Sequence, residues 1–152
     1  MGKVLIVFRG LNNLLDDDSV VKWAQAHDYA LKIFNYFEVD SAKQYVLGLK
    51  DSQIEVLGFS RGAVSAYDLC RATPNVQYKR LYTVGTYITV TQSFGNSRPE
   101  LDNVEMHRNY VEDFQQPDDF QDYACNISLG HCEHMASVKK ALAIIEAAHY
   151  QQ

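Results

Sequence analysis

The sequence predicts an α/β fold, a three-layer αβα sandwich around a five-stranded, mostly parallel sheet. Short apolar runs rich in β-branched residues alternate with stretches whose apolar residues recur at helical spacing. Strands that alternate with helices indicate a parallel sheet covered on both faces. The 152 residues are 47% hydrophobic and contain no repeat, low-complexity tract or Pro/Gly/Ser-rich linker, so we expect residues 1–152 to form a single domain.

Strands and helices are expected in strict alternation over the first half of the chain. The strands are predicted at residues 4–8, 31–37, 53–59, 80–87 and 104–110. The helices are predicted after the capping residues 16–19, over about 40–49, from Ser60 to about Ala72, and over about 133–149. Core-facing positions are expected at Val20, Trp23, Ala24 and His27 in the first helix and at Met135, Val138, Leu142 and Ile145 in the last. Residues 88–103 and 111–130 are polar and are predicted to be long loops.

Charge and cysteine content exclude several classes of function. The formal net charge is −5 and no basic block is present, which argues against a nucleic-acid partner or an anionic membrane surface. No segment has the length of a membrane span, and the first residues do not resemble a signal peptide, so we expect a cytoplasmic protein. The chain has three cysteines, a number that favours reduced thiols over a disulfide framework. A disulfide between Cys125 and Cys132 is the alternative.

The segment Gly58-Phe59-Ser60-Arg61-Gly62 matches the G-x-S-x-G pattern of a nucleophile elbow. It follows an apolar strand and precedes a helical stretch, which is the context the motif requires. In such a turn the serine backbone is strained and the positions two residues before and after it leave no room for a side chain. We therefore predict Ser60 as the nucleophile. The alternative is an ordinary strand-to-helix turn in which Ser60 only caps the helix.

Two backbone amides are expected to form an oxyanion hole. Arg61 N–H lies at the start of the helix that follows Ser60, where the helix dipole is positive. The second donor is expected in the loop after the first strand, at Leu11, with Asn12 as the alternative. Gly10 lets this loop approach a substrate closely, so Gly10 and Asn12 are predicted to bind substrate.

The chain resembles the α/β-hydrolase superfamily along Val4–Asn12, the elbow, Asn103–Asp113 and Gly130-His131. Its Gly-Phe-Ser-Arg-Gly-Ala elbow is similar to those of bacterial phospholipase-effector domains and cutinase-like esterases. The resemblance implies the strand order 2-1-3-4-5 and a site at the carboxyl edge of the sheet. The first hairpin of the larger family and a cap domain are missing, which indicates a minimal esterase with an open site for small or flexible substrates.

In this superfamily the triad follows the chain order serine, acid, histidine, which excludes His27. His107 falls inside a predicted strand and His149 at the far end of the last helix. We favour His131 as the base, with His134 as the alternative. Asp113, just beyond the fifth strand, is the favoured acid, with the alternatives Asp118 and Asp119 in the same loop.

These residues predict a serine hydrolase that cleaves a carboxylic ester or thioester through an acyl-enzyme. Neither a cofactor nor a metal is expected, because Cys125, His131, Cys132 and His134 lack the spacing of a zinc site. The expected partner is a small-molecule ester or thioester; the sequence indicates no oligomeric state. An amidase, peptidase or lactonase would use the same triad, and a non-catalytic binding protein of the same fold is the alternative outside the enzymes.

Overall fold

The fold was examined in a computed structural model that describes residues 2–86, 98–112, 120 and 125–149. Its strands form one sheet in the order β2-β1-β3-β4-β5-β6, and every neighbouring pair is parallel. The strands are β1 Gly2–Phe8, β2 Tyr29–Phe34, β3 Ser52–Phe59, β4 Tyr78–Val84, β5 Val104–Glu112 and β6 Cys125–Gly130. The predicted order 2-1-3-4-5 is confirmed, and one strand is added at its end.

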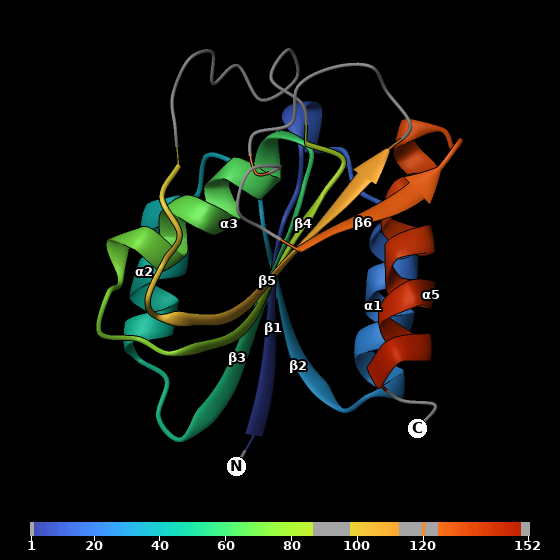
Figure 1. Cartoon of the computed structure of the whole chain (residues 1–152). Helices are drawn as coiled ribbons and strands as arrows, with labels where there is room; N and C mark the ends of the chain where they lie inside the picture. Colours follow the sequence, from blue (N-terminus) through green and yellow to red (C-terminus); the bar gives the residue numbers. More distant parts are fainter. Residues whose placement is uncertain (1, 87–97, 113–119, 121–124, 150–152) are drawn as a thin grey trace.

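The helices cover both faces of this sheet, as predicted (Figure 1). One pair, α1 and α5, lies on one face, and the other pair, α2 and α3, lies on the opposite face. Their bounds are α1 Asp17–Ala26, α2 Val39–Leu47, α3 Arg61–Ala72 and α5 Ser137–His149, with short 3-10 turns η1 Leu11–Asn13 and η2 His134–Ala136.

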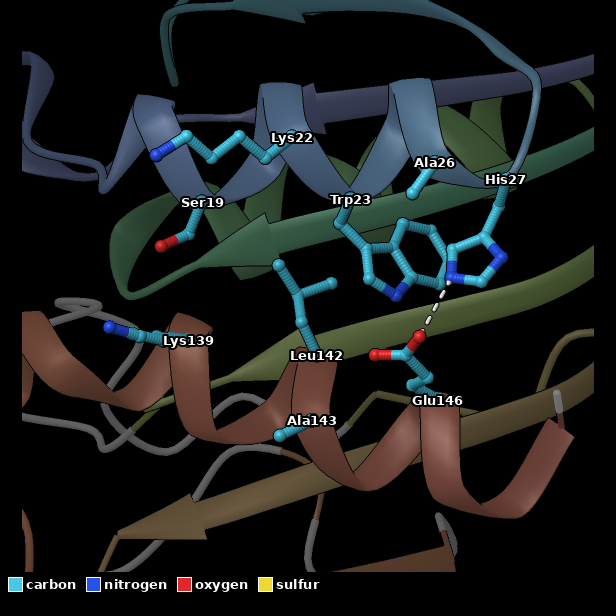
Figure 2. Close-up of a pocket in the computed structure, with 9 residues that line it drawn as sticks. All are labelled: Ser19, Lys22, Trp23, Ala26, His27, Lys139, Leu142, Ala143 and Glu146. Atoms are coloured by element: carbon cyan, nitrogen blue, oxygen red, sulfur yellow. Dashed lines mark ion pairs between the residues drawn. The ribbon is translucent and has the colours of Figure 1, made fainter. Parts of the chain in front are cut away.

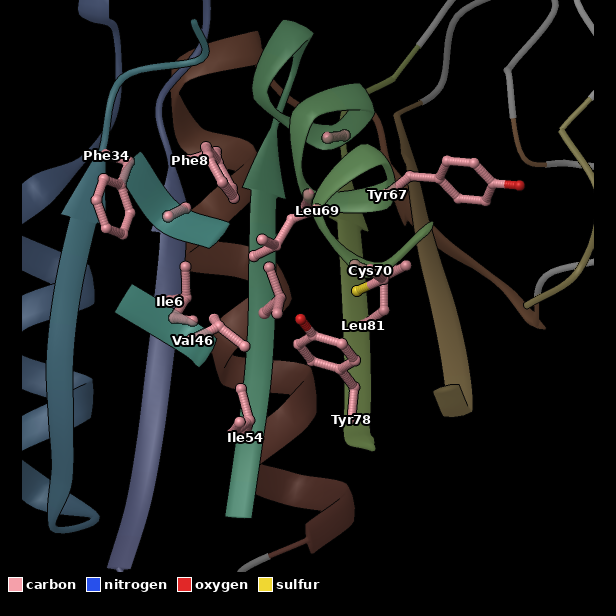
Figure 3. Packing of buried hydrophobic residues seen from close by; sticks show 14 of the residues in the cluster. Ile6, Phe8, Phe34, Val46, Ile54, Tyr67, Leu69, Cys70, Tyr78 and Leu81 are labelled. Atoms are coloured by element: carbon pink, nitrogen blue, oxygen red, sulfur yellow. The ribbon is translucent and has the colours of Figure 1, made fainter. Parts of the chain in front are cut away.

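Each face of the sheet has its own apolar core. On the side of α2 and α3, the core includes side chains from β1, β3, β4 and α3 (Figure 3), among them Ile6, Phe8, Ile54, Leu69, Tyr78 and Leu81. On the side of α1 and α5 it contains Leu5, Val7, Trp23, Leu57, Leu142 and Ile145. Alternate residues of the central strands thus enter opposite cores, which is why β1 is apolar from Val4 to Phe8.

The first helix begins where its acidic residues predict. The Asp16 carboxylate accepts the backbone N–H of Ser19 at 3.2 Å, and Asp17 and Asp18 follow in the first turn, where negative charge stabilises a helix. Val20, Trp23 and Ala24 are buried as expected. Within the described residues, no helix has both the length and the hydropathy needed to cross a bilayer.

Two predictions about the last third of the chain need correction. The expected loop over residues 111–130 contains β6, whose Ile127 and Leu129 face the same core two residues apart. The last helix starts at Ser137 and not near residue 133, because residues 134–136 form a 3-10 turn and leave Met135 exposed. Much of the other expected loop, residues 87–97, lies outside the described residues.

Candidate active site

The backbone turns sharply at Ser60, between the end of β3 and the start of α3. Ser60 has φ 57° and ψ −123°, in the half of conformational space that residues other than glycine rarely enter. Such a conformation costs about 1–3 kcal/mol and persists only where the surroundings impose it. Here Ser60 N–H donates to Val84 O at 2.8 Å, which ties the turn to the end of β4.

The two glycines of the elbow are required by close backbone contacts. A Cβ at Gly58 would overlap the backbone of Gly62 and Ala63. A Cβ at Gly62 would overlap the carbonyl oxygens of Phe8 and Arg9. This is the steric reason predicted from the motif. Gly58 packs against the start of α3, and Gly62 packs against the end of β1.

The loop after β1 packs directly against the nucleophile turn. A Cβ added to Gly10 would come within 3.2 Å of Ser60 Cβ, so only a glycine allows this approach without displacement. Three hydrogen bonds from the Arg9 guanidinium anchor the loop: Nη2 donates to Asp17 Oδ2 at 2.6 Å, Nε to Asp17 Oδ1 at 3.3 Å and Nη1 to Asn35 Oδ1 at 3.1 Å. The loop that was expected to carry an oxyanion donor is therefore held in place beside Ser60.

The expected amide donors, Leu11 and Arg61, each open a helical segment. Leu11 is the first residue of η1 and Arg61 the first of α3. The first amides of a helix have no acceptor within that helix and are available to an anion. The Arg61 side chain turns away over the ring of Tyr36, 5.4 Å from its centroid.

A cavity of about 120 Å³ lies beside the elbow. Ser60 is only 3% exposed, but it lines this cavity. The lining residues are Gly10, Leu11, Asn12, Leu14, Phe59, Ser60 and His134. The cavity thus brings together the predicted nucleophile, Ser60, and the loop after β1 that was predicted to supply an oxyanion donor and substrate contacts. It also contains one histidine, His134.

That histidine is paired with a buried carboxylate. His134 Nδ1 lies 2.5 Å from Glu112 Oε1 and 2.9 Å from Oε2, and the Glu112 side chain is 1% exposed. An ionised carboxylate can only accept a hydrogen bond, so Nδ1 carries the proton and Nε2 of the neutral ring keeps its lone pair. The imidazole also packs on Phe59, with ring centroids 4.6 Å apart. A basic nitrogen, an orienting carboxylate and a hydroxyl around one cavity can perform nucleophilic catalysis.

Glu112 reaches this place because β5 continues two residues beyond the predicted end. Its ladder with β6 is irregular at this point: Val111 pairs with Ser128 and Glu112 with Gly130, so the extra residue, Leu129, belongs to β6. Gly85, directly after β4, lies against the pair: a Cβ there would come 2.5 Å from Glu112 Oε1 and 3.1 Å from His134 Cε1. Sequence reasoning missed both Glu112 and Gly85. The signal for Glu112 was its place at the carboxyl end of a strand, the edge where such sites form.

Replacing Gly85 with alanine is expected to lower kcat/KM by about 100-fold, because the new Cβ displaces the Glu112–His134 pair and a 1 Å misplacement costs about that much. Gly130→Ala is the matched control: Gly130 also has a positive φ, 68° against 65°, but no atom within 4 Å of the added Cβ. Both variants carry the strain of an alanine at positive φ, but only the alanine at position 85 contacts the Glu112–His134 pair. Steady-state kinetics and urea unfolding of the two variants therefore separate the effect of that contact from the effect of backbone strain. Equal losses of activity in the two variants would contradict this account.

The structure brings a different histidine to the cavity from the one favoured in the sequence analysis, and the favoured acid is not among the described residues. His131 is exposed and is not among the residues that line the cavity beside Ser60. His134, which was the alternative, occupies that position. Asp113, Asp118 and Asp119 lie outside the described residues, and Glu112, next to Asp113, is the carboxylate that meets the imidazole.

His107 points into a face of the sheet, as its position in β5 predicted. Its Nε2 is 2.8 Å from Thr83 Oγ1, its ring lies 5.1 Å from that of Phe120, and burial lowers the pKa of His107 to about 4. Because an unfolded histidine has a pKa near 6.5, the unfolded state binds the proton more readily between these values. This histidine is therefore neutral and structural.

The free energy of unfolding is expected to fall as the pH drops from about 6.5 to 4, by up to roughly 3 kcal/mol from His107 alone. His107→Gln removes this contribution and keeps a side chain that can bond Thr83. Urea unfolding at pH 7, 6, 5 and 4 measures the slope in both proteins. Parallel slopes would show that His107 titrates alike in the folded and unfolded states.

A thiol near the site is a poor competitor for the role of nucleophile. Burial and the Glu112 carboxylate raise the pKa of Cys132, which keeps this thiol protonated at neutral pH. Cys132 and Cys125 are both free, as is the buried Cys70.

A larger groove, about 320 Å³, lies between α1 and α5 (Figure 2). Ser19 lies at one end of it and His27 at the other, so these two side chains do not meet. The Ser19 hydroxyl donates to Asp16 at 2.6 Å, and His27 pairs with Glu146 at 3.4 Å. The groove therefore lacks the hydroxyl–imidazole pair of the cavity beside Ser60.

The fold and the position of the elbow can be compared with known proteins. No protein-family model matches the chain, and no curated protein matches its sequence. Solved structures do match. Human thioesterase 2 superposes with a TM-score of 0.67 at 12% identity, over 98% of this chain and 94% of that one. The chain has the α/β-hydrolase fold.

Two further structures of this fold are similar over nearly the whole chain. The esterase domain of a Rhodothermus marinus protein has a TM-score of 0.62 at 13% identity, covering 97% of this chain and 84% of that one. ClbQ of the colibactin pathway has a TM-score of 0.64 at 9% identity, covering 97% and 95%. The α/β-hydrolase fold predicted from the elbow and the strand pattern is thus confirmed at low sequence identity.

Proposed function

We propose that the protein is a serine hydrolase that cleaves a carboxylic ester or thioester through an acyl-enzyme. The observation that carries the proposal is the cavity at the carboxyl edge of the sheet, where the strained Ser60 and the Glu112-paired His134 line the same space. Solved structures of the same fold include an esterase domain and a thioesterase, which supports these two classes of substrate.

In the proposed first step, Ser60 Oγ bonds to the carbonyl carbon of the substrate and its proton passes to His134 Nε2. Glu112 holds the ring in the tautomer that can accept this proton and stabilises the imidazolium that forms. The amides of Leu11 and Arg61 donate to the oxygen that becomes negative. The bond to the leaving alcohol or thiol then breaks, and that group takes the proton from Nε2.

The second step consumes water and restores the enzyme. A water molecule gives a proton to His134 Nε2 while its oxygen bonds to the acyl carbon. The bond from that carbon to Ser60 Oγ breaks, the acid leaves, and Oγ recovers the proton from the imidazolium. In this proposal His134 and Glu112 take the roles expected of His131 and Asp113, because His134 lines the cavity with Ser60 and its Nδ1 pairs with Glu112.

Labelling by a fluorophosphonate probe is expected for the wild type and lost in Ser60→Ala, because the probe reacts only with an activated serine. Alanine keeps the backbone of residue 60 and removes only the hydroxyl. Ser19→Ala, in the groove between α1 and α5, is the matched control and should label like the wild type. Mass spectrometry of the labelled peptide identifies the modified residue. A folded wild type that does not label would favour a non-catalytic binding protein.

A further inference from the structure

The cavity beside Ser60 is small and its side-chain walls are apolar. Leu11, Leu14 and Phe59 contribute the apolar walls, and Gly10 contributes only backbone. The reacting groups, Ser60 and His134, form the remaining side together with the exposed Asn12. Such a surface favours an uncharged hydrocarbon group over a polar one.

The volume of about 120 Å³ sets a limit on what this space can hold. An apolar protein cavity of about 150 Å³ accommodates benzene, which has six carbons. By the same measure, the cavity beside Ser60 accommodates about four or five carbons. A longer chain would need to leave through the mouth of the cavity.

Among the apolar side chains that line the cavity, Leu14 is the most exposed to solvent. Its side chain is 46% exposed, whereas the backbone around it is held by two hydrogen bonds, Gly10 N to Leu14 O at 2.9 Å and Leu14 N to Leu11 O at 3.2 Å. The size of this side chain can therefore change without loss of the turn that carries it. A larger or smaller residue at position 14 would alter the depth of the cavity and little else.

We infer that this cavity holds the acyl group of the substrate, that it favours acyl chains of up to about five carbons, and that Leu14 determines this limit. The inference rests on the proposed function. In the acyl-enzyme the acyl group stays bonded to Ser60 Oγ, so its chain has to occupy the space that Ser60 lines, whereas the leaving group departs before this ester is hydrolysed. Residues of the loop 10–14 supply most of the apolar wall of that space.

The test is a series of p-nitrophenyl esters with acyl chains of two to twelve carbons, assayed below their micelle concentrations. For the wild type, kcat/KM should rise by up to about fourfold per methylene to four or five carbons and fall at least tenfold by eight. Leu14→Ala removes three carbons from the wall and should move the optimum two or three carbons longer. Leu14→Phe should move it to the acetyl ester. Leu47→Ala, equally conservative at a residue 56% exposed on α2, should leave the profile unchanged.

A second series keeps the acetyl group and varies the alcohol from methyl to octyl. If the variants at position 14 shift the preference for the alcohol and leave the preference for the acyl chain unmoved, the cavity holds the leaving group and the inference is overturned. A wild-type optimum at eight carbons or more overturns it as well. Absence of Ser60-dependent hydrolysis across both series, with no probe labelling, is the separate result that rejects the proposed function.

Discussion

His134→Ala is expected to lower kcat/KM by roughly 10⁴-fold or more, since loss of the base leaves only binding and oxyanion stabilisation. The reason is local: within the described residues, His134 is the histidine that lines the cavity with Ser60. His131→Ala, three residues earlier, is the matched control. His131 is exposed, so its removal should leave kcat/KM within about threefold of the wild type.

Circular dichroism and thermal unfolding of both variants should resemble those of the wild type, which restricts the difference to catalysis. His134 also packs on Phe59, so a modest loss of stability is expected in His134→Ala alone. His134→Gln refills part of this space and should remain inactive. If His131→Ala proves inactive while His134→Ala retains activity, the base is the residue favoured by sequence reasoning and the proposed scheme is wrong.

Glu112→Gln is expected to lower kcat by roughly 10³- to 10⁴-fold, with a smaller effect on KM. The amide of glutamine can donate to Nδ1, which places the imidazole proton on Nε2 and removes the lone pair that must accept the Ser60 proton. Glu112→Asp keeps a carboxylate on a shorter side chain and should retain more activity than Glu112→Gln. Steady-state kinetics across pH 5–9 measure the loss and show whether any residual activity follows a displaced profile.

Asp113→Asn is the control that distinguishes the two carboxylates. It removes the acid favoured from sequence and leaves the Glu112–His134 pair intact. We expect it to retain most of the wild-type activity. The contrary pattern, an inactive Asp113→Asn beside an active Glu112→Gln, would assign the orienting role to Asp113.

The first strands and the elbow were predictable because each depends on local patterns, whereas the strand order was expected from the resemblance to the α/β-hydrolase superfamily. Apolar runs such as Val4–Phe8 enter two cores at once, and a strand of this kind needs no knowledge of its neighbours to be recognised. The elbow depends on contacts within a few residues and on the ends of its two neighbouring strands, β1 and β4, and its glycines predict the turn at Ser60 directly. β6 was missed because its alternation is short and its polar residues resemble those of a loop.

The pairing of base and acid was decided by contacts between residues far apart in the chain. Glu112 and His134 are separated by 22 positions, and their meeting depends on where β5 ends and on the 3-10 turn that carries the histidine. His131 precedes the 3-10 turn and His134 opens it, so the position of that turn decides which of the two histidines lines the cavity. Local sequence therefore specifies the nucleophile and its strained turn, whereas the choice among nearby histidines and carboxylates depends on tertiary packing, including the space left by Gly85.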